Sequence, residues 1–66
     1  MKSTIYKAIK NEAARRDNAF KAFSEADHPD ARGVFDLHNA AVKDLVAEYK
    51  AAGGCRPVDQ FVKEAP

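Results

Sequence analysis

The sequence predicts an all-α fold: an antiparallel helical hairpin with a short third helix toward the C-terminus. Two observations support this class. Apart from the final Pro66, the Gly and Pro residues lie at only two places, residues 29–33 and 53–57, and they divide the chain into three segments. Within each segment, apolar residues recur at the three- and four-residue spacing of an amphipathic helix. A chain of 66 residues forms one domain, residues 1–66, near the lower size limit for independent folding.

Residues 3–26 are predicted to form the first long helix. No Gly or Pro interrupts them, and Ser3 or Thr4 is placed to serve as the N-cap. At about 100° per residue, the apolar residues fall on one face of this helix. They are Ile5, Ile9, Ala13, Phe20 and Phe23.

The second helix is expected to end at Ala52, and the sequence leaves open whether it begins at Pro29 or at Val34. Pro29 suits a first helical position, whereas Gly33 inside a helix would cost about 1 kcal/mol. Gly53-Gly54 provides a left-handed stop. The predicted apolar stripe consists of Val34, Leu37, Ala41, Val42, Leu45, Tyr49 and Ala52.

Residues 57–64 carry Val58, Phe61 and Val62 at helical spacing, which predicts a short third helix that folds back over the end of the pair. The two long helices must run antiparallel because few residues connect them. A lone hairpin leaves apolar area uncovered, so we expect a homodimer that forms a four-helix bundle.

Composition points to a cytoplasmic protein. Cys55 is the single cysteine, so no internal disulfide can form and a reducing compartment fits, although the role of this thiol stays open. No apolar run reaches the roughly 18–20 residues of a membrane span, and the N-terminus lacks the apolar core of a signal peptide.

Charge is distributed unevenly along the chain. Residues 1–21 carry six basic and two acidic side chains, 6 − 2 = +4, whereas residues 22–66 carry five basic and eight acidic ones, 5 − 8 = −3. The basic first helix can therefore lie beside an acidic second helix and steer the pairing. The alternative is that Lys7, Lys10 and Lys21 present a basic face to nucleic acid.

Three polar residues fall within the predicted apolar stripes, namely Glu12, Arg16 and His38. Glu12 and Arg16 are four residues apart with the acid first, which favours a side-chain pair. This pair either lies at the edge of the seam and reaches water, or fixes the register of a dimer or meets the charges of a partner. His38 is expected to be a hydrogen-bonded core residue. Together with Phe20, these three residues form the candidate partner-binding set.

The sequence shows no catalytic, metal-binding or cofactor-binding motif. Ser3, Ser24, His28, His38 and Cys55 lie on different segments, and neither a glycine-rich phosphate loop nor a nucleophile elbow is present. The two histidines and the cysteine do not have the spacing of zinc ligands. We therefore expect no enzymatic activity, no cofactor and no metal.

Residues 19–30 read AFKAFSEADHPD, in which Ala19, Phe20, Lys21 and Phe23 precede His28-Pro29-Asp30. This arrangement resembles the middle of a J-domain, the module that recruits Hsp70 chaperones. The resemblance implies that His28, Pro29 and Asp30 contact the chaperone, with Lys21 as a basic neighbour. A simpler interpretation is a helix entry, in which Pro29 begins the helix and Asp30 stabilises its positive end.

The run IKNEAARRDNAFKAF, residues 9–23, within one short helical domain, resembles in type the small helical accessory proteins from the early regions of lambdoid phages. This resemblance implies a protein of the host cytoplasm that modulates host or phage development by binding a macromolecule. We therefore interpret the chain as a non-enzymatic interaction or regulatory module. A nucleic-acid-associated regulator and a J-like chaperone recruiter are the alternatives.

Overall fold

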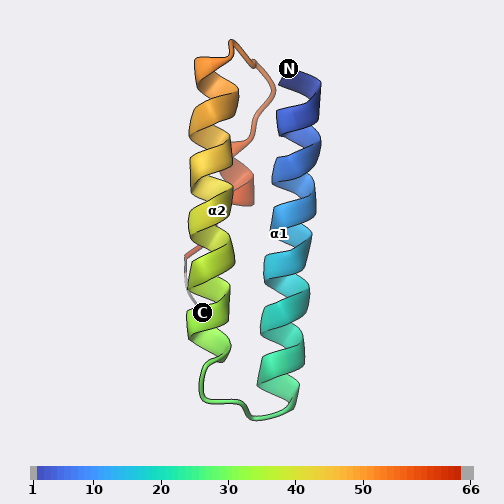
Figure 1. Cartoon of the computed structure of the whole chain (residues 1–66), viewed down its shortest axis with the longest axis vertical. Helices are drawn as coiled ribbons and strands as arrows, with labels where there is room; N and C mark the ends of the chain where they lie inside the picture. The colour runs from blue at the N-terminus through green and yellow to red at the C-terminus, as the bar shows by residue number, and fades with distance from the viewer. Residues whose placement is uncertain (1, 65–66) are drawn as a thin grey trace.

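The computed structural model describes residues 2–64 and is all-α, with two long antiparallel helices (Figure 1). Helix α1 spans Lys2–Glu25, α2 spans Ala31–Ala51, and a single 3-10 turn, η1, spans Asp59–Phe61. The molecule is elongated, with principal extents of 41 × 16 × 14 Å. The predicted helical hairpin is confirmed.

The core lies along the seam between α1 and α2. Ile9, Ala13, Val42, Val46 and Tyr49 are buried there, and Val58 packs into the same cluster from the C-terminal segment. A second contact near the connection joins Phe20 to the buried Phe35, whose rings meet edge to face with centroids 5.5 Å apart. Apolar burial along the seam therefore holds the two helices together.

The start of α1 differs from the prediction. The helix already includes Lys2, so Ser3 and Thr4 lie inside its first turn and neither is the N-cap. The N-cap prediction was wrong because this helix begins before the first residue with a capping side chain. Backbone N–H groups of this first turn have no partner within the helix.

Helix α1 ends in a Schellman motif with Asp27 in the left-handed conformation, φ 52°. The Asp27 N–H donates to the Ser24 carbonyl at 3.1 Å, and the His28 N–H donates to the Phe23 carbonyl at 2.9 Å. The His28 ring packs on the Phe23 ring with centroids 4.8 Å apart, which is the contact that often accompanies this motif.

Helix α2 begins at Ala31 with Asp30 as its N-cap, so neither Pro29 nor Val34 is the first helical residue. Pro29 precedes the cap instead and directs the chain into it. Gly33 lies inside the helix, and a Cβ atom there would meet only the exposed Asp30 carboxylate, at 2.5 Å, which is free to turn away, so the structure does not require glycine at this position.

The predicted glycine stop of α2 is confirmed, since Gly53 has φ 86° and its N–H donates to the Lys50 carbonyl at 3.0 Å. The third helix was predicted over residues 57–64, but only the three residues of η1 are helical. We call residues 54–64 the strap. Figure 1 shows it passing from the end of α2 toward the start of α1 and then running along the far side of both helices.

The strap also explains why the apolar stripe of α2 was placed too far to one side. Leu37 is 71% exposed and Ala52 is exposed, whereas Phe35 and Val46, which the stripe omitted, are buried. The strap covers the flank of α2 that carries Asn39, so the buried face extends toward that flank and away from Leu37.

Candidate functional site

Arg16 lies at the centre of a buried polar cluster and is only 1% exposed. Its Nη1 donates to Oδ1 of Asn39 at 2.9 Å and also to the Phe61 carbonyl of the strap. Its guanidinium carbon lies 5.3 Å from the centre of the Phe35 ring. Arg16 therefore neither reaches water nor offers itself to a partner, contrary to both interpretations from the sequence.

Asn39 completes this cluster by binding the strap backbone twice. Its Nδ2 donates to the Lys63 carbonyl at 2.6 Å, and its Oδ1 accepts the Lys63 N–H at 3.2 Å. The buried polar groups of Arg16 and Asn39 are thus hydrogen-bonded to each other and to the strap backbone. Their function is to fix the strap against both helices.

Asp17 borders the cluster and provides a counter-charge to Arg16, with Oδ1 of Asp17 3.0 Å from Nε of Arg16. Partial burial by itself would raise the pKa of the Asp17 carboxyl. The hydrogen bond and charge of Arg16, assisted by Lys63 at 3.4 Å, outweigh this effect and hold the pKa below its ordinary value.

Glu12 pairs across the helices with His38 and not with Arg16. Oε1 of Glu12 and Nδ1 of His38 are 2.5 Å apart, and Arg15 approaches the other carboxylate oxygen at 3.7 Å. The side chains of Glu12 and His38 are 18% and 28% exposed, so this cluster borders solvent. His38 is hydrogen-bonded, as predicted, but the expectation that it lies in the core was wrong, because it sits at the solvent edge of the seam.

The side of the hairpin opposite the strap forms a continuous half-buried surface, which we call the open face. Figure 1 shows that the near side of α1 and α2 is not crossed by the strap. The spacing of three, four or seven residues aligns its members in one row on each helix. They are Ile5, Ala8, Glu12, Ala19 and Phe23 on α1, and Val34, His38, Ala41 and Leu45 on α2.

The remaining predicted site residues lie at the corner of the hairpin. Phe20 is half-buried against Phe35, so it contributes to packing inside the chain. His28, Pro29 and Asp30 are exposed, and Nδ1 of His28 accepts the Asp30 N–H at 3.1 Å. The corner residues therefore close the turn, and a chaperone-docking role for them stays a prediction.

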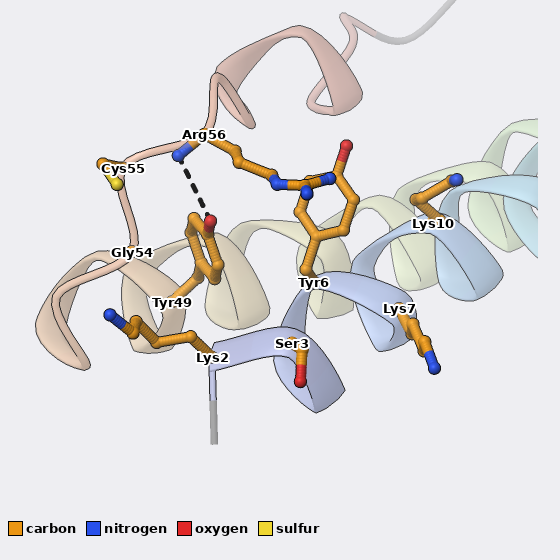
Figure 2. Close-up of a pocket in the computed structure, with 9 residues that line it drawn as sticks. All are labelled: Lys2, Ser3, Tyr6, Lys7, Lys10, Tyr49, Gly54, Cys55 and Arg56. Atoms are coloured by element: carbon orange, nitrogen blue, oxygen red, sulfur yellow. Dashed lines mark hydrogen bonds between the residues drawn. The ribbon is translucent and has the colours of Figure 1, made fainter.

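A pocket of about 460 Å³ lies at the other end of the hairpin, where α1 begins and α2 ends (Figure 2). We call it the basic pocket, because four cationic side chains and no acidic one occur among its described lining residues. These residues are Lys2, Ser3, Tyr6, Lys7, Lys10, Tyr49, Gly54, Cys55 and Arg56. The structure thus brings Lys7 and Lys10 together at one site but leaves Lys21 outside it.

Figure 2 shows the side chain of Arg56 reaching across the ring of Tyr6, and its guanidinium carbon lies 4.9 Å from the ring centre. Nζ of Lys10 lies 5.8 Å from the same centre. The backbone N–H of Arg56 donates to the Tyr49 hydroxyl at 3.2 Å. Aromatic rings and hydrogen bonds therefore fix the position of the strap residue that carries the guanidinium.

Gly54 allows the strap to approach Tyr49 closely. A Cβ atom at this position would lie 2.3 Å from ring carbons of Tyr49, so a larger residue would displace the ring or the chain. Sequence reasoning did not assign Lys2, Tyr6, Tyr49 or Arg56 to a site. One available signal was the glycine stop followed by Pro57, which turns the chain back toward the first turns of an antiparallel partner helix.

No group of three metal-ligating side chains occurs within residues 2–64, and no helix in this part of the chain is long and apolar enough to cross a membrane. Comparison with protein-family models, with curated proteins and with solved structures gave no match. The class of the chain is therefore defined by its own fold, an all-α helical hairpin.

Proposed function

We propose that this chain is a non-enzymatic interaction module that binds a helical partner on the open face, and that its first partner is a second copy of itself. One observation carries the proposal. The open face is apolar except for the cluster of Glu12, Arg15 and His38, and no segment within residues 2–64 covers it. The opposite side of the hairpin, by contrast, is covered by the strap.

The shape and charge of the open face suit another pair of helices. Ala8, Ala19 and Ala41 are small, so a second helix can approach closely between the larger side chains. The polar cluster contains both signs of charge near the middle of the face. A two-fold axis that crosses α1 at right angles near residues 13–14 would place Arg15 of one chain opposite Glu12 of the other, and with this axis the face is self-complementary.

The proposal is tested by the mass of the protein in sedimentation equilibrium. We expect a mass near twice 7.3 kDa that falls on dilution. The variant L37E places a charge at the edge of the open face, where the side chain is already 71% exposed, so the hairpin fold should survive while the dimer dissociates.

A47E is the matched control, because Ala47 is exposed on the other side of α2 and its replacement should leave the dimer intact. A monomer at every concentration would overturn self-association. Equal dissociation by L37E and A47E would show that the open face is not the interface.

A further inference from the structure

The basic pocket carries a second inference that is independent of the open face. We propose that it binds a nucleotide through the phosphate group, either as a free nucleotide or as one unit of a single-stranded nucleic acid. Lys2, Lys7, Lys10 and Arg56 surround the pocket, and none of its nine described lining residues is acidic. Several cations around one pocket, with no carboxylate among the described lining residues, form an electrostatic site for phosphate, in which Arg56 and Lys10 lie nearest the Tyr6 ring and Lys7 points away from Arg56 (Figure 2).

The size of the pocket points to an organic phosphate. Its volume of about 460 Å³ lies within the range of roughly 300–1,000 Å³ typical of small-molecule sites. This space exceeds what one phosphate group fills, so it leaves room for a sugar and a base. The half-buried ring of Tyr6 forms part of the wall and supplies apolar surface for them, whereas Tyr49 is buried beneath Gly54.

Arg56 is positioned for phosphate before any ligand binds. Its backbone N–H is held by the Tyr49 hydroxyl, and its guanidinium lies over the Tyr6 ring at 4.9 Å. A planar guanidinium can bind two phosphate oxygens together, which a lysine ammonium cannot do with the same geometry. Fixing this group in advance reduces the loss of side-chain freedom on binding.

The same geometry favours a nucleotide over an acidic peptide. Bases of single-stranded nucleic acids stack on aromatic rings and on guanidinium planes, and here the guanidinium of Arg56 lies over the Tyr6 ring, so a base would stack on the guanidinium. A carboxylate side chain would be attracted by the positive charge of the pocket, but it has no flat ring that could stack on the guanidinium. The cations lie mainly on the first turns of α1, and Lys21, more than two turns beyond Lys10, is not part of the pocket.

The experiment is a titration of the full chain with uridine 5′-monophosphate and, separately, with a short single-stranded oligouridylate, followed by amide chemical shifts. We expect saturable shifts around Tyr6, Gly54 and Arg56 with at least one of these probes. K10Q should weaken binding about fivefold and lower the salt dependence of oligouridylate binding by about 0.7 in log–log slope.

R56K keeps the charge but removes the planar fork, so it should also weaken binding severalfold. K21Q is the matched control, since it removes the same charge from the same helix outside the pocket. Tighter binding of oligouridylate than of the monophosphate would identify a strand as the ligand, and equal binding a free nucleotide.

Three results would overturn the proposal. The first is the absence of saturable shifts with both probes, and the second is equal weakening by K10Q and K21Q, which would indicate general attraction to a basic helix. The third is equally tight binding of polyglutamate, which would make the pocket a site for acidic peptides. Far-UV circular dichroism of each variant verifies that the hairpin remains folded.

Discussion

The two ends of the hairpin are closed in different ways. At the corner, residues 26–30 turn the chain through hydrogen bonds between neighbours, and Phe23 and His28 pack locally. At the opposite end the chain is closed by the strap, whose Arg56 lies over the ring of Tyr6, a residue distant in sequence, and farther along the hairpin Arg16 holds Phe61, 45 residues away. The corner can form as soon as the helices meet, whereas the other end requires the complete tertiary structure.

Both helices nevertheless end in the same hydrogen-bonding motif. In α1 the left-handed position is filled by Asp27, and in α2 it is filled by Gly53. The Gly54 N–H bonds to the Tyr49 carbonyl at 3.0 Å, as the His28 N–H bonds to Phe23. A local hydrogen-bonding motif therefore ends each helix, and only the strap end adds contacts between residues distant in sequence.

The largest effect is expected from R16M, which removes the buried charge that joins the strap to both helices. The Phe61 carbonyl and Asn39 would lose a donor, so we expect a loss of about 3 kcal/mol in the free energy of unfolding. Urea unfolding followed by circular dichroism measures it. R15M is the control when both variants are compared at a concentration where the protein is monomeric, because the Arg15 side chain is 72% exposed in the single chain and should contribute little there.

Hydrogen exchange distinguishes a local from a global effect of R16M. The Lys63 N–H, which is bonded to Asn39, should lose its protection from exchange in this variant. Protection of amides in the middle of α1 should fall only as much as the global free energy of unfolding falls. Equal stability of R16M and R15M would show that the strap does not depend on the buried guanidinium.

The next effect concerns the glycine pair at the open end. G54A should destabilise the protein by about 2 kcal/mol, because the added methyl group would overlap the Tyr49 ring at 2.3 Å. G53A meets no atom within 4 Å and should cost only the left-handed strain of about 1 kcal/mol. Thermal unfolding of both variants measures the difference, and a larger loss for G53A would contradict close packing at Gly54.

At the corner we expect a gain. D27G relieves the left-handed conformation of Asp27, φ 52°, and should stabilise the protein by about 0.5–1 kcal/mol. D27A retains a Cβ atom and should give no gain. Comparing the urea midpoints of the two variants tests this, and a destabilised D27G would mean that the Asp27 side chain makes a stabilising interaction of its own.

The smallest effect concerns acid stability near the strap. Because the folded pKa of Asp17 is lowered, its carboxylate stabilises the fold above the ordinary pKa of 3.8, and this contribution is lost as the pH falls through the folded pKa. D17N should cost at most about 0.5 kcal/mol at neutral pH after solvent screening. The stability difference from the parent should shrink in urea titrations below pH 3.8. If the stability difference between D17N and the parent instead grows as the pH falls, the folded pKa of Asp17 is raised and not lowered.

The sequence was sufficient for the hairpin because long amphipathic segments and Gly or Pro breaks are local signals. It also located the Gly53 stop, since a left-handed glycine at a helix end is a backbone property. It did not anticipate that Phe35 and Val46 are buried while Leu37 is exposed, because the strap covers one flank of α2. A pattern on a single helix contains no information about which flank a distant segment covers.

The candidate sites also combine features that the sequence predicts with features that only the fold reveals. Lys7 and Lys10 were recognised as neighbours on one helix face, but Arg56 joins them only because the chain turns back after Gly54. The assignment of Arg16 to a Glu12 pair failed because helical spacing makes that pair available without excluding Asn39 and Phe61 as partners. The sequence shows which side chains within one helix are close enough to pair. It does not show whether a residue from another segment binds the same side chain instead.

The hydrogen bonds from Arg16 and Asn39 to the strap end on main-chain atoms, the carbonyls of Phe61 and Lys63 and the N–H of Lys63. Every residue type other than proline offers the same atoms, so the identity of the side chains at positions 61 and 63 is not fixed by these bonds. The exposed strap positions 60, 63 and 64 can therefore display new side chains beside a preserved backbone, while Val58 and Phe61 remain part of the packing against the helices.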